Sequence, residues 1–151
     1  MTRKHSSLRK GRRSIAGQLY LITFATDRRT RHFSDWDVAA DAARSLSDPA
    51  NWQASQLLAW VLMPDHWHGL VELHKDDSLP RRIGWVKGHT ARQLRKGHPG
   101  LGKIWSHAYH DHALRKEEDL LQVSEYLLMN PVRAGLASNV GSYPFWNVAW
   151  L

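Results

Sequence analysis

The sequence predicts an α+β fold built on one antiparallel sheet, and three features of its patterning lead to that prediction. Residues 19–26, 56–63 and 66–73 are rich in β-branched and aromatic residues, which is typical of strands. Residues 34–46 and 80–96 repeat apolar residues at helical spacing. The second and third strands are separated only by a Pro-Asp turn, so they are expected to pair as an antiparallel hairpin.

Length and composition indicate one globular domain with a basic character. The chain has 151 residues, of which 42% are hydrophobic, and its formal net charge is +7. We divide it into a basic arm, residues 1–17, and a single domain, residues 18–151. The charge suits a polyanionic partner such as nucleic acid, although a generic basic protein explains the charge equally well.

Several classes of protein are excluded or disfavoured by the same composition. The absence of cysteine excludes disulfides, thiolate metal sites and cysteine nucleophiles. No apolar run approaches the ~20 residues that span a bilayer. The basic arm has no apolar segment behind it and does not look like a signal peptide, so a cytoplasmic location is expected.

The first helix is expected to begin at the sequence SDWD, residues 34–37, which has the pattern of a capping box. It should end near Leu46, because residues 48–51 (DPAN) break the helical pattern. Five residues at helical spacing are expected to face the sheet: Trp36, Ala39, Ala40, Ala43 and Leu46.

Pro80 is expected to open the second helix, because proline is tolerated in the first helical turn. The buried stripe of this helix is predicted to consist of Ile83, Val86, Thr90 and Leu94. Its outer faces are predicted to be strongly positive, with Arg81, Arg82, Lys87, Arg92, Arg95 and Lys96.

The remaining elements complete a recognisable order. A fourth strand is expected at residues 104–108, and a further helix at residues 116–130, which Pro131 ends. Strand, helix, strand, strand, helix, strand is the βαββαβ order of a ferredoxin-like sandwich, with a four-stranded antiparallel sheet and two helices on one face. The further helix is a C-terminal addition to this sandwich, and the aromatic tail that follows is expected to be loop-like.

The third strand carries the first candidate site. His66 and His68 are separated by Trp67, and alternate side chains of a strand share a face. The two imidazoles can therefore bind a divalent metal from one face, while Trp67 anchors the strand in a core on the other. This spacing alone leaves a structural role and a metal role equally open.

Two further groups of polar residues are candidates. Gln122, Tyr126 and Asn130 are spaced four apart and share one helix face, which on spacing alone favours an ordinary exposed polar face. A second histidine cluster consists of His107, His110, His112 and Asp111. The more specific of its two interpretations is a zinc site. Without an HExxH pattern or a cysteine partner, we interpret this cluster as polar residues near an active site or a DNA path.

Five segments, taken in order, resemble one known family. They read LYLITFAT, AWVLMPDHWHGLVEL, IWSHAYHDHALRKEEDL, EYLLMNPVRAGL and SYPFW. This succession, over about residues 19–146, resembles the REP-associated tyrosine transposases, which belong to the His-hydrophobic-His nuclease group. The resemblance implies a ferredoxin-like fold with a catalytic tyrosine on the added helix. It also implies a metal-dependent endonuclease or transposase that cleaves and rejoins single-stranded DNA at hairpins through a covalent 5′-phosphotyrosine.

Carried over residue by residue, the resemblance implies that His66, His68 and Asn130 bind Mg²⁺ or Mn²⁺ and that Tyr126 is the nucleophile. Two imidazoles favour later metals than Mg²⁺, so Mn²⁺ is expected to support activity well. The expected partner is single-stranded or hairpin DNA of the REP type, with no membrane, and both a monomer and a homodimer stay open. The residues expected to contact DNA phosphates are Arg12, Arg13, Arg82, Lys87, Arg92, Arg115 and Arg133.

Two other functions compete with this interpretation. One is a non-catalytic regulatory protein that binds hairpin DNA or RNA, and the other is a metal-dependent hydrolase of small phosphate esters. The presence of His66, His68, Tyr126 and Asn130 together argues against the regulatory protein, because a binding module has no need of all four.

Overall fold

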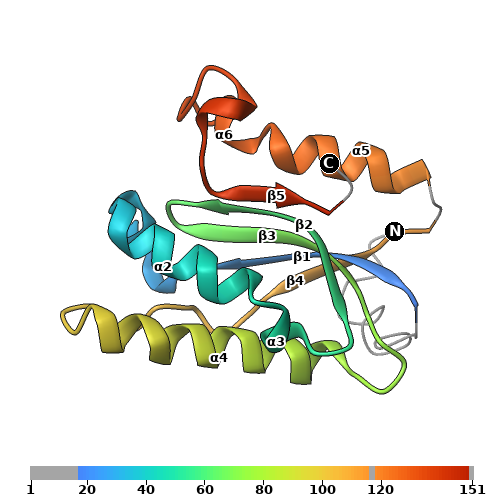
Figure 1. The fold of residues 1–151 in the computed structure, drawn as a ribbon, viewed down its shortest axis with the longest axis horizontal. Helices are drawn as coiled ribbons and strands as arrows, with labels where there is room; N and C mark the ends of the chain where they lie inside the picture. Colours follow the sequence, from blue (N-terminus) through green and yellow to red (C-terminus); the bar gives the residue numbers. More distant parts are fainter. Residues whose placement is uncertain (1–16, 116–117, 150–151) are drawn as a thin grey trace.

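A computed structural model describes residues 17–115 and 118–149 and contains one antiparallel sheet. The strand order is β4-β1-β3-β2-β5, and every neighbouring pair is antiparallel (Figure 1). The strands are β1 (Leu19–Ala25), β2 (Gln56–Met63), β3 (His66–Glu72), β4 (His110–Ala113) and β5 (Trp146–Val148). The first four strands follow the predicted βαββαβ arrangement, so the mixed α and β fold is confirmed.

Helices cover both faces of the sheet (Figure 1). Helices α2 (Trp36–Ser47) and α4 (Leu79–Gly97) pack together on one face, with the short helix α3 (Pro49–Trp52) beside them. Helix α5 (Glu118–Leu128) lies across the other face, against β2 and β3, and leads into α6 (Asn130–Arg133). Three short 3₁₀ helices complete the set: Asp27–Arg29, His32–Ser34 and Val140–Ser142. Within the described residues, no helix combines the length and the apolar character that crossing a membrane requires.

The sheet has five strands rather than the predicted four. The aromatic tail, expected to be loop-like, contributes β5, which pairs with β2. This pairing occupies the β2 side of the sheet, so β4 and β5 are its two edge strands.

The fourth strand begins at His110, so its predicted position at residues 104–108 is wrong. Within that segment only Trp105 makes a bridge, to Thr26. The physical reason is that the Lys87 side chain competes for the backbone carbonyls of this segment. The ammonium of Lys87 donates to the carbonyls of residues 106, 107 and 108 at 2.9–3.3 Å, so these carbonyls are occupied where a strand would need them as acceptors.

Helix α2 begins close to the predicted residue, but its cap and its buried face differ from the prediction. The Asp35 carboxylate caps it by accepting from the amides of Asp37 and Val38. Trp36 is 65% exposed and contacts Phe145 edge-on instead of facing the sheet. The buried stripe consists of Val38, Ala39, Ala42 and Leu46.

Helix α4 buries the predicted stripe but also two of its cations, which corrects the expectation that Arg82 and Lys87 contribute to an exposed positive surface. Arg82 pairs with Asp77 at 2.6 Å and donates to the carbonyl of Asn51. Burial raises the pKa of Asp77, but the hydrogen bonds from Arg82 and its neighbours outweigh it and hold the pKa below its usual value. A buried arginine needs such partners, so these guanidinium donors are used inside the protein.

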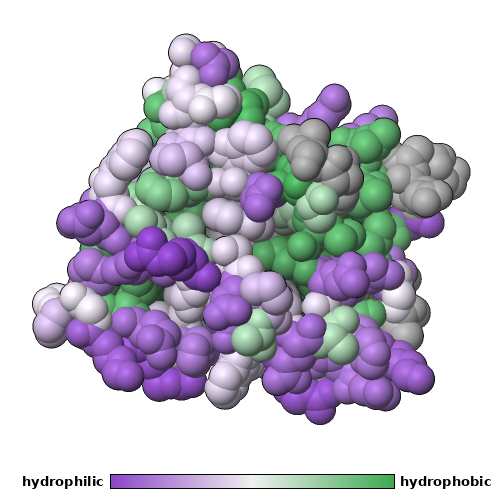
Figure 2. All heavy atoms as spheres, viewed as in Figure 1, coloured by the Kyte–Doolittle hydropathy of each residue, from purple (hydrophilic) through white to green (hydrophobic). Residues whose placement is uncertain are grey.

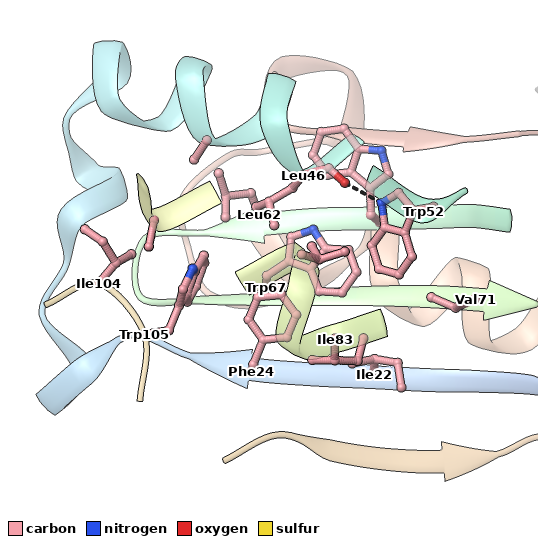
Figure 3. Close-up of a cluster of buried hydrophobic side chains, with 14 of the residues drawn as sticks. Ile22, Phe24, Leu46, Trp52, Leu62, Trp67, Val71, Ile83, Ile104 and Trp105 are labelled. Carbon is pink, nitrogen blue, oxygen red and sulfur yellow. Dashed lines mark hydrogen bonds between the residues drawn. The ribbon is translucent and has the colours of Figure 1, made fainter. Parts of the chain in front are cut away.

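Trp67 is fully buried on the α2 and α4 side of the sheet, as predicted from strand alternation. Its indole stacks against Phe24 at 4.8 Å and against Trp52 at 5.9 Å between ring centroids (Figure 3). The ring also lies over Gly69, where an added Cβ would stand 2.0 Å from the indole. Glycine is therefore required at this position of β3 by close packing.

We predict that Gly69→Ala destabilises the fold by about 1–3 kcal/mol or more, because the buried Trp67 ring cannot move aside without displacing its aromatic neighbours. Gly84→Ala is the matched control, since nothing lies within 4 Å of its added Cβ and alanine favours helix. Urea unfolding measures both. An unchanged midpoint for Gly69→Ala would contradict the packing described.

Candidate active site

His66 and His68 project from β3 toward the sheet face that α5 covers. Their ring centroids are 4.6 Å apart and the rings are nearly perpendicular. The residues opposite them on β2, Met63 and Val61, belong to the apolar layer that also contains Leu127 of α5. The two imidazoles are thus partly buried beside an apolar wall, as strand alternation predicted.

The ring of His66 is oriented by a carboxylate. Asp65 Oδ1 lies 2.7 Å from His66 Nδ1, and Arg29 donates to Asp65 Oδ2 at 3.1 Å. Burial raises the pKa of Asp65. The hydrogen bonds from His66 and Arg29 have the opposite and larger combined effect, so the pKa lies below its usual value. An ionised carboxylate only accepts hydrogen bonds, so the proton of neutral His66 sits on Nδ1 and leaves the Nε2 lone pair free.

The ring of His68 is held by Thr23, whose hydroxyl lies 2.8 Å from Nδ1. Burial lowers the pKa of His68 to about 3, and electrostatic interactions with His66, Arg133 and Arg29 add to this effect. His68 is therefore neutral near pH 7. When its Nδ1 donates to Thr23, Nε2 is available as a metal ligand. Outer partners of this kind fix the ligand atom of a metal-binding histidine.

Asn130 supplies a third candidate ligand at the start of α6, which contacts β2. Its side-chain amide nitrogen is buried and has no hydrogen-bond partner among the described residues. The oxygen and nitrogen of such an amide are assigned from their partners, so a buried amide with an unpartnered atom fits a role as a metal ligand through its oxygen. No group of three or more His, Asp or Glu side chains in the described part of the chain can hold a metal. The Asn130 amide is therefore a candidate third ligand beside the two histidines.

Tyr126 lies on α5, and 56% of its surface is exposed. The guanidinium of Arg133 stacks over its ring at 3.9 Å from the centroid and donates to its backbone carbonyl at 2.8 Å. The same arginine acts electrostatically on His68. Arg133 thus contacts the phenol ring and lies close enough to β3 to influence His68.

A model of IS200-like transposases matches residues 14–130. The chain belongs to this family. It is 27% identical over 139 residues to a candidate REP-associated tyrosine transposase of Haemophilus influenzae, covering 85% of this chain and 78% of that protein. It is 31% identical over 91 residues to the REP-associated tyrosine transposase of Escherichia coli K12, covering 60% of this chain and 52% of that protein, about half of its length.

Solved structures share the fold. A REP-associated tyrosine transposase bound to a REP hairpin superimposes with a TM-score of 0.68 at 24% identity, over 89% of this chain and 79% of that one. A candidate transposase from Deinococcus radiodurans superimposes with a TM-score of 0.59 at 25% identity, over 76% of this chain and 92% of that one. The family and the similarity to REP-associated tyrosine transposases, expected from the sequence motifs, are confirmed.

The structure of this family member brings some predicted site residues to one face of the sheet and leaves others elsewhere. His66, His68, Tyr126, Asn130 and Arg133 all belong to β3 or to the C-terminal helices on that face. Arg92 is exposed on α4, in the opposite layer, where Figure 2 shows hydrophilic residues gathered. Arg115 is exposed after β4. Arg82 and Lys87 are used internally, and Arg12 and Arg13 lie outside the described residues.

Sequence reasoning missed Asp65, Thr23 and Arg29. Asp65 had a signal, because a carboxylate directly precedes His66 in the turn between β2 and β3. Thr23 is far away in sequence and meets His68 only through the register of β1 against β3. Arg29 sits in a 3₁₀ helix after β1 and had no distinguishing pattern.

Strand alternation argues against a zinc site in the second histidine cluster. His110 and His112 of β4 are exposed, whereas Asp111 between them is only 8% exposed and points to the opposite face. His107 lies before the strand, in the groove beside α4. The carboxylate and the two imidazoles therefore cannot converge on one ion.

We predict that Asp65→Asn shifts the ring proton of His66 toward Nε2, because the amide no longer requires a donor at Nδ1. Nitrogen NMR of the imidazole reports the tautomer without any metal. Asp76→Asn is the control, since Asp76 is an exposed carboxylate 4.0 Å from His74. An Nδ1-protonated His66 in both variants would show that Asp65 does not set the tautomer.

Proposed function

We propose that this protein cleaves and rejoins single-stranded DNA at hairpins, with Tyr126 as the nucleophile and a divalent metal bound by His66, His68 and Asn130. The observation that carries the proposal is the state of the histidine pair. Each Nδ1 has a protein partner, and within the described residues neither Nε2 has one. Helix α5, which carries Tyr126, contacts β2 and β3 on the same face within one chain, and membership of the transposase family makes DNA the natural substrate.

The chemical step transfers a phosphoryl group to the protein. The phenol oxygen of Tyr126 forms a bond to the scissile phosphorus, and the bond from phosphorus to the 3′ oxygen breaks. The phenol proton leaves to solvent, and the 3′ oxygen takes up a proton to become a hydroxyl. The 5′ end then stays attached as a phosphotyrosine, which a 3′ hydroxyl can later attack to rejoin strands without ATP.

The chain's own residues supply position and charge for this step. Bound Mg²⁺ or Mn²⁺ would polarise the scissile phosphate and stabilise the leaving oxygen. Asp65 and Thr23 hold the two imidazoles with Nε2 free, and Arg133 holds the ring of Tyr126. An arginine has five N–H donors in a planar fork, so Arg133 can also donate to a DNA phosphate beside the tyrosine.

Hairpin DNA is the substrate that the similarities favour. One solved structure with this fold contains a REP hairpin, and the net charge of +7 suits nucleic acid. Exposed cations that could contact phosphates include Arg92 and Arg133.

We predict that Tyr126→Phe abolishes cleavage and the covalent adduct, by about 10³-fold or more, while hairpin binding changes little because phenylalanine keeps the ring under Arg133. The assay incubates labelled single-stranded hairpins with Mn²⁺ and resolves protein–DNA adducts on a denaturing gel. Chelation of the metal should also abolish the adduct, and added Mn²⁺ should restore it.

Tyr143→Phe is the matched control. The hydroxyl of Tyr143 donates to the carbonyl of Leu62 at 2.6 Å, and burial raises its pKa to about 12, so it is a poor nucleophile. Adduct formation by Tyr126→Phe would refute the assignment of the nucleophile. Tight hairpin binding without cleavage in any divalent metal would instead support a non-catalytic regulatory protein.

A further inference from the structure

The edge strand β4 adds two more histidines to the face that carries His66 and His68. Register decides this point. Thr23 of β1 is opposite His68 on one side and opposite His110 on the other. Residues directly opposite in an antiparallel pair project to the same face, so His68, Thr23 and His110 form one row across three strands.

His112 occupies the next row on the same face. Leu21 of β1 is opposite Leu70 of β3 and opposite His112 of β4. Neighbouring strands are about 4.8 Å apart, so His110 lies roughly 10 Å from His68, two strands away. The rows therefore extend the candidate active site toward the β4 edge of the sheet.

Both added imidazoles are available to a ligand. His110 and His112 are exposed, and neither has a hydrogen-bond or ion-pair partner among the residues that the structure describes. The strand beneath them is held firmly. Asp111 is buried on the other face, and the ammonium of Lys87 binds the three carbonyls just before the strand begins.

We propose that His110 and His112 bind phosphates of the single-stranded DNA that continues from the scissile bond, so that the DNA crosses β1 and leaves over the β4 edge. This inference rests on the proposed function and adds to it the path of the flanking strand. Imidazole N–H groups donate to phosphate oxygens, and two imidazoles on one face of a firmly held strand offer two such donors at a regular spacing. The positive net charge of the chain favours the same ligand.

The test measures binding of three labelled DNAs by fluorescence anisotropy at constant salt. One is a hairpin without a flank, one carries a single-stranded 5′ flank and one carries a 3′ flank. All proteins carry Tyr126→Phe so that binding is measured without cleavage. Loss of a hydrogen-bond donor should weaken binding of one flanked hairpin by roughly threefold to tenfold for each of His110→Ala and His112→Ala, and leave the hairpin without a flank unaffected.

Two comparisons separate phosphate binding from a structural effect. His107→Ala is the matched control, because this exposed histidine lies in the same segment but lines the groove beside α4, and it should bind all three DNAs normally. His112→Gln keeps an N–H donor and should recover part of the lost affinity. In the protein with Tyr126 intact, the double variant should raise KM for the flanked substrate with little change in kcat.

Unchanged binding of both flanked hairpins by the double variant overturns the inference, and so does an equal loss on the hairpin without a flank. These outcomes leave the proposed function standing when Tyr126 still forms its adduct. If the unsubstituted protein forms no adduct, the proposed function itself fails, whatever the histidine variants do.

Discussion

The packing of Trp67 is the constraint on which the candidate site depends. Its indole is enclosed by Phe24, Trp52 and the space that Gly69 leaves free. This large side chain can be buried on only one face of the sheet. A slip of one residue in β3 would move it to the other face and reverse every neighbour with it. Burial of Trp67 therefore determines that His66 and His68 face α5.

Helix α5 forms a second layer over the face that carries His66 and His68, so this face is partly buried instead of fully solvated. The ferredoxin-like half of the fold buries one side of the sheet under α2 and α4, and α5 covers β2 and β3 on the other. The cover is partial, since Tyr126 on α5 and the histidines of β4 stay exposed. A partly covered sheet face gives low solvent access near the imidazoles while its β4 side stays exposed.

Charged groups of the protein divide into internal and external sets. Arg82 and Lys87 are cations that the fold uses to hold loops, through Asp77 and through a row of carbonyls. Arg29 donates a hydrogen bond to Asp65, and Asp65 in turn orients the ring of His66. Arg133 is different, because it stacks on an exposed tyrosine and remains exposed itself. Net charge therefore overstates the surface that is free to bind DNA.

The sequence by itself determined the alternation of β3, the hairpin that contains it, the helix stripe of α4 and the family to which the chain belongs. Each of these depends on local periodicity or on short motifs that can be recognised in the sequence without knowing the tertiary contacts. Only the tertiary structure decided the partner of His68, the burial of Arg82 and Lys87, the start of β4 and the presence of β5. Most of these features depend on contacts between residues far apart in sequence, such as Thr23 with His68 and Lys87 with residues 106–108. Register and competition for backbone carbonyls follow from how the whole chain packs, because a side chain such as Lys87 can take acceptors that local propensity would assign to a strand.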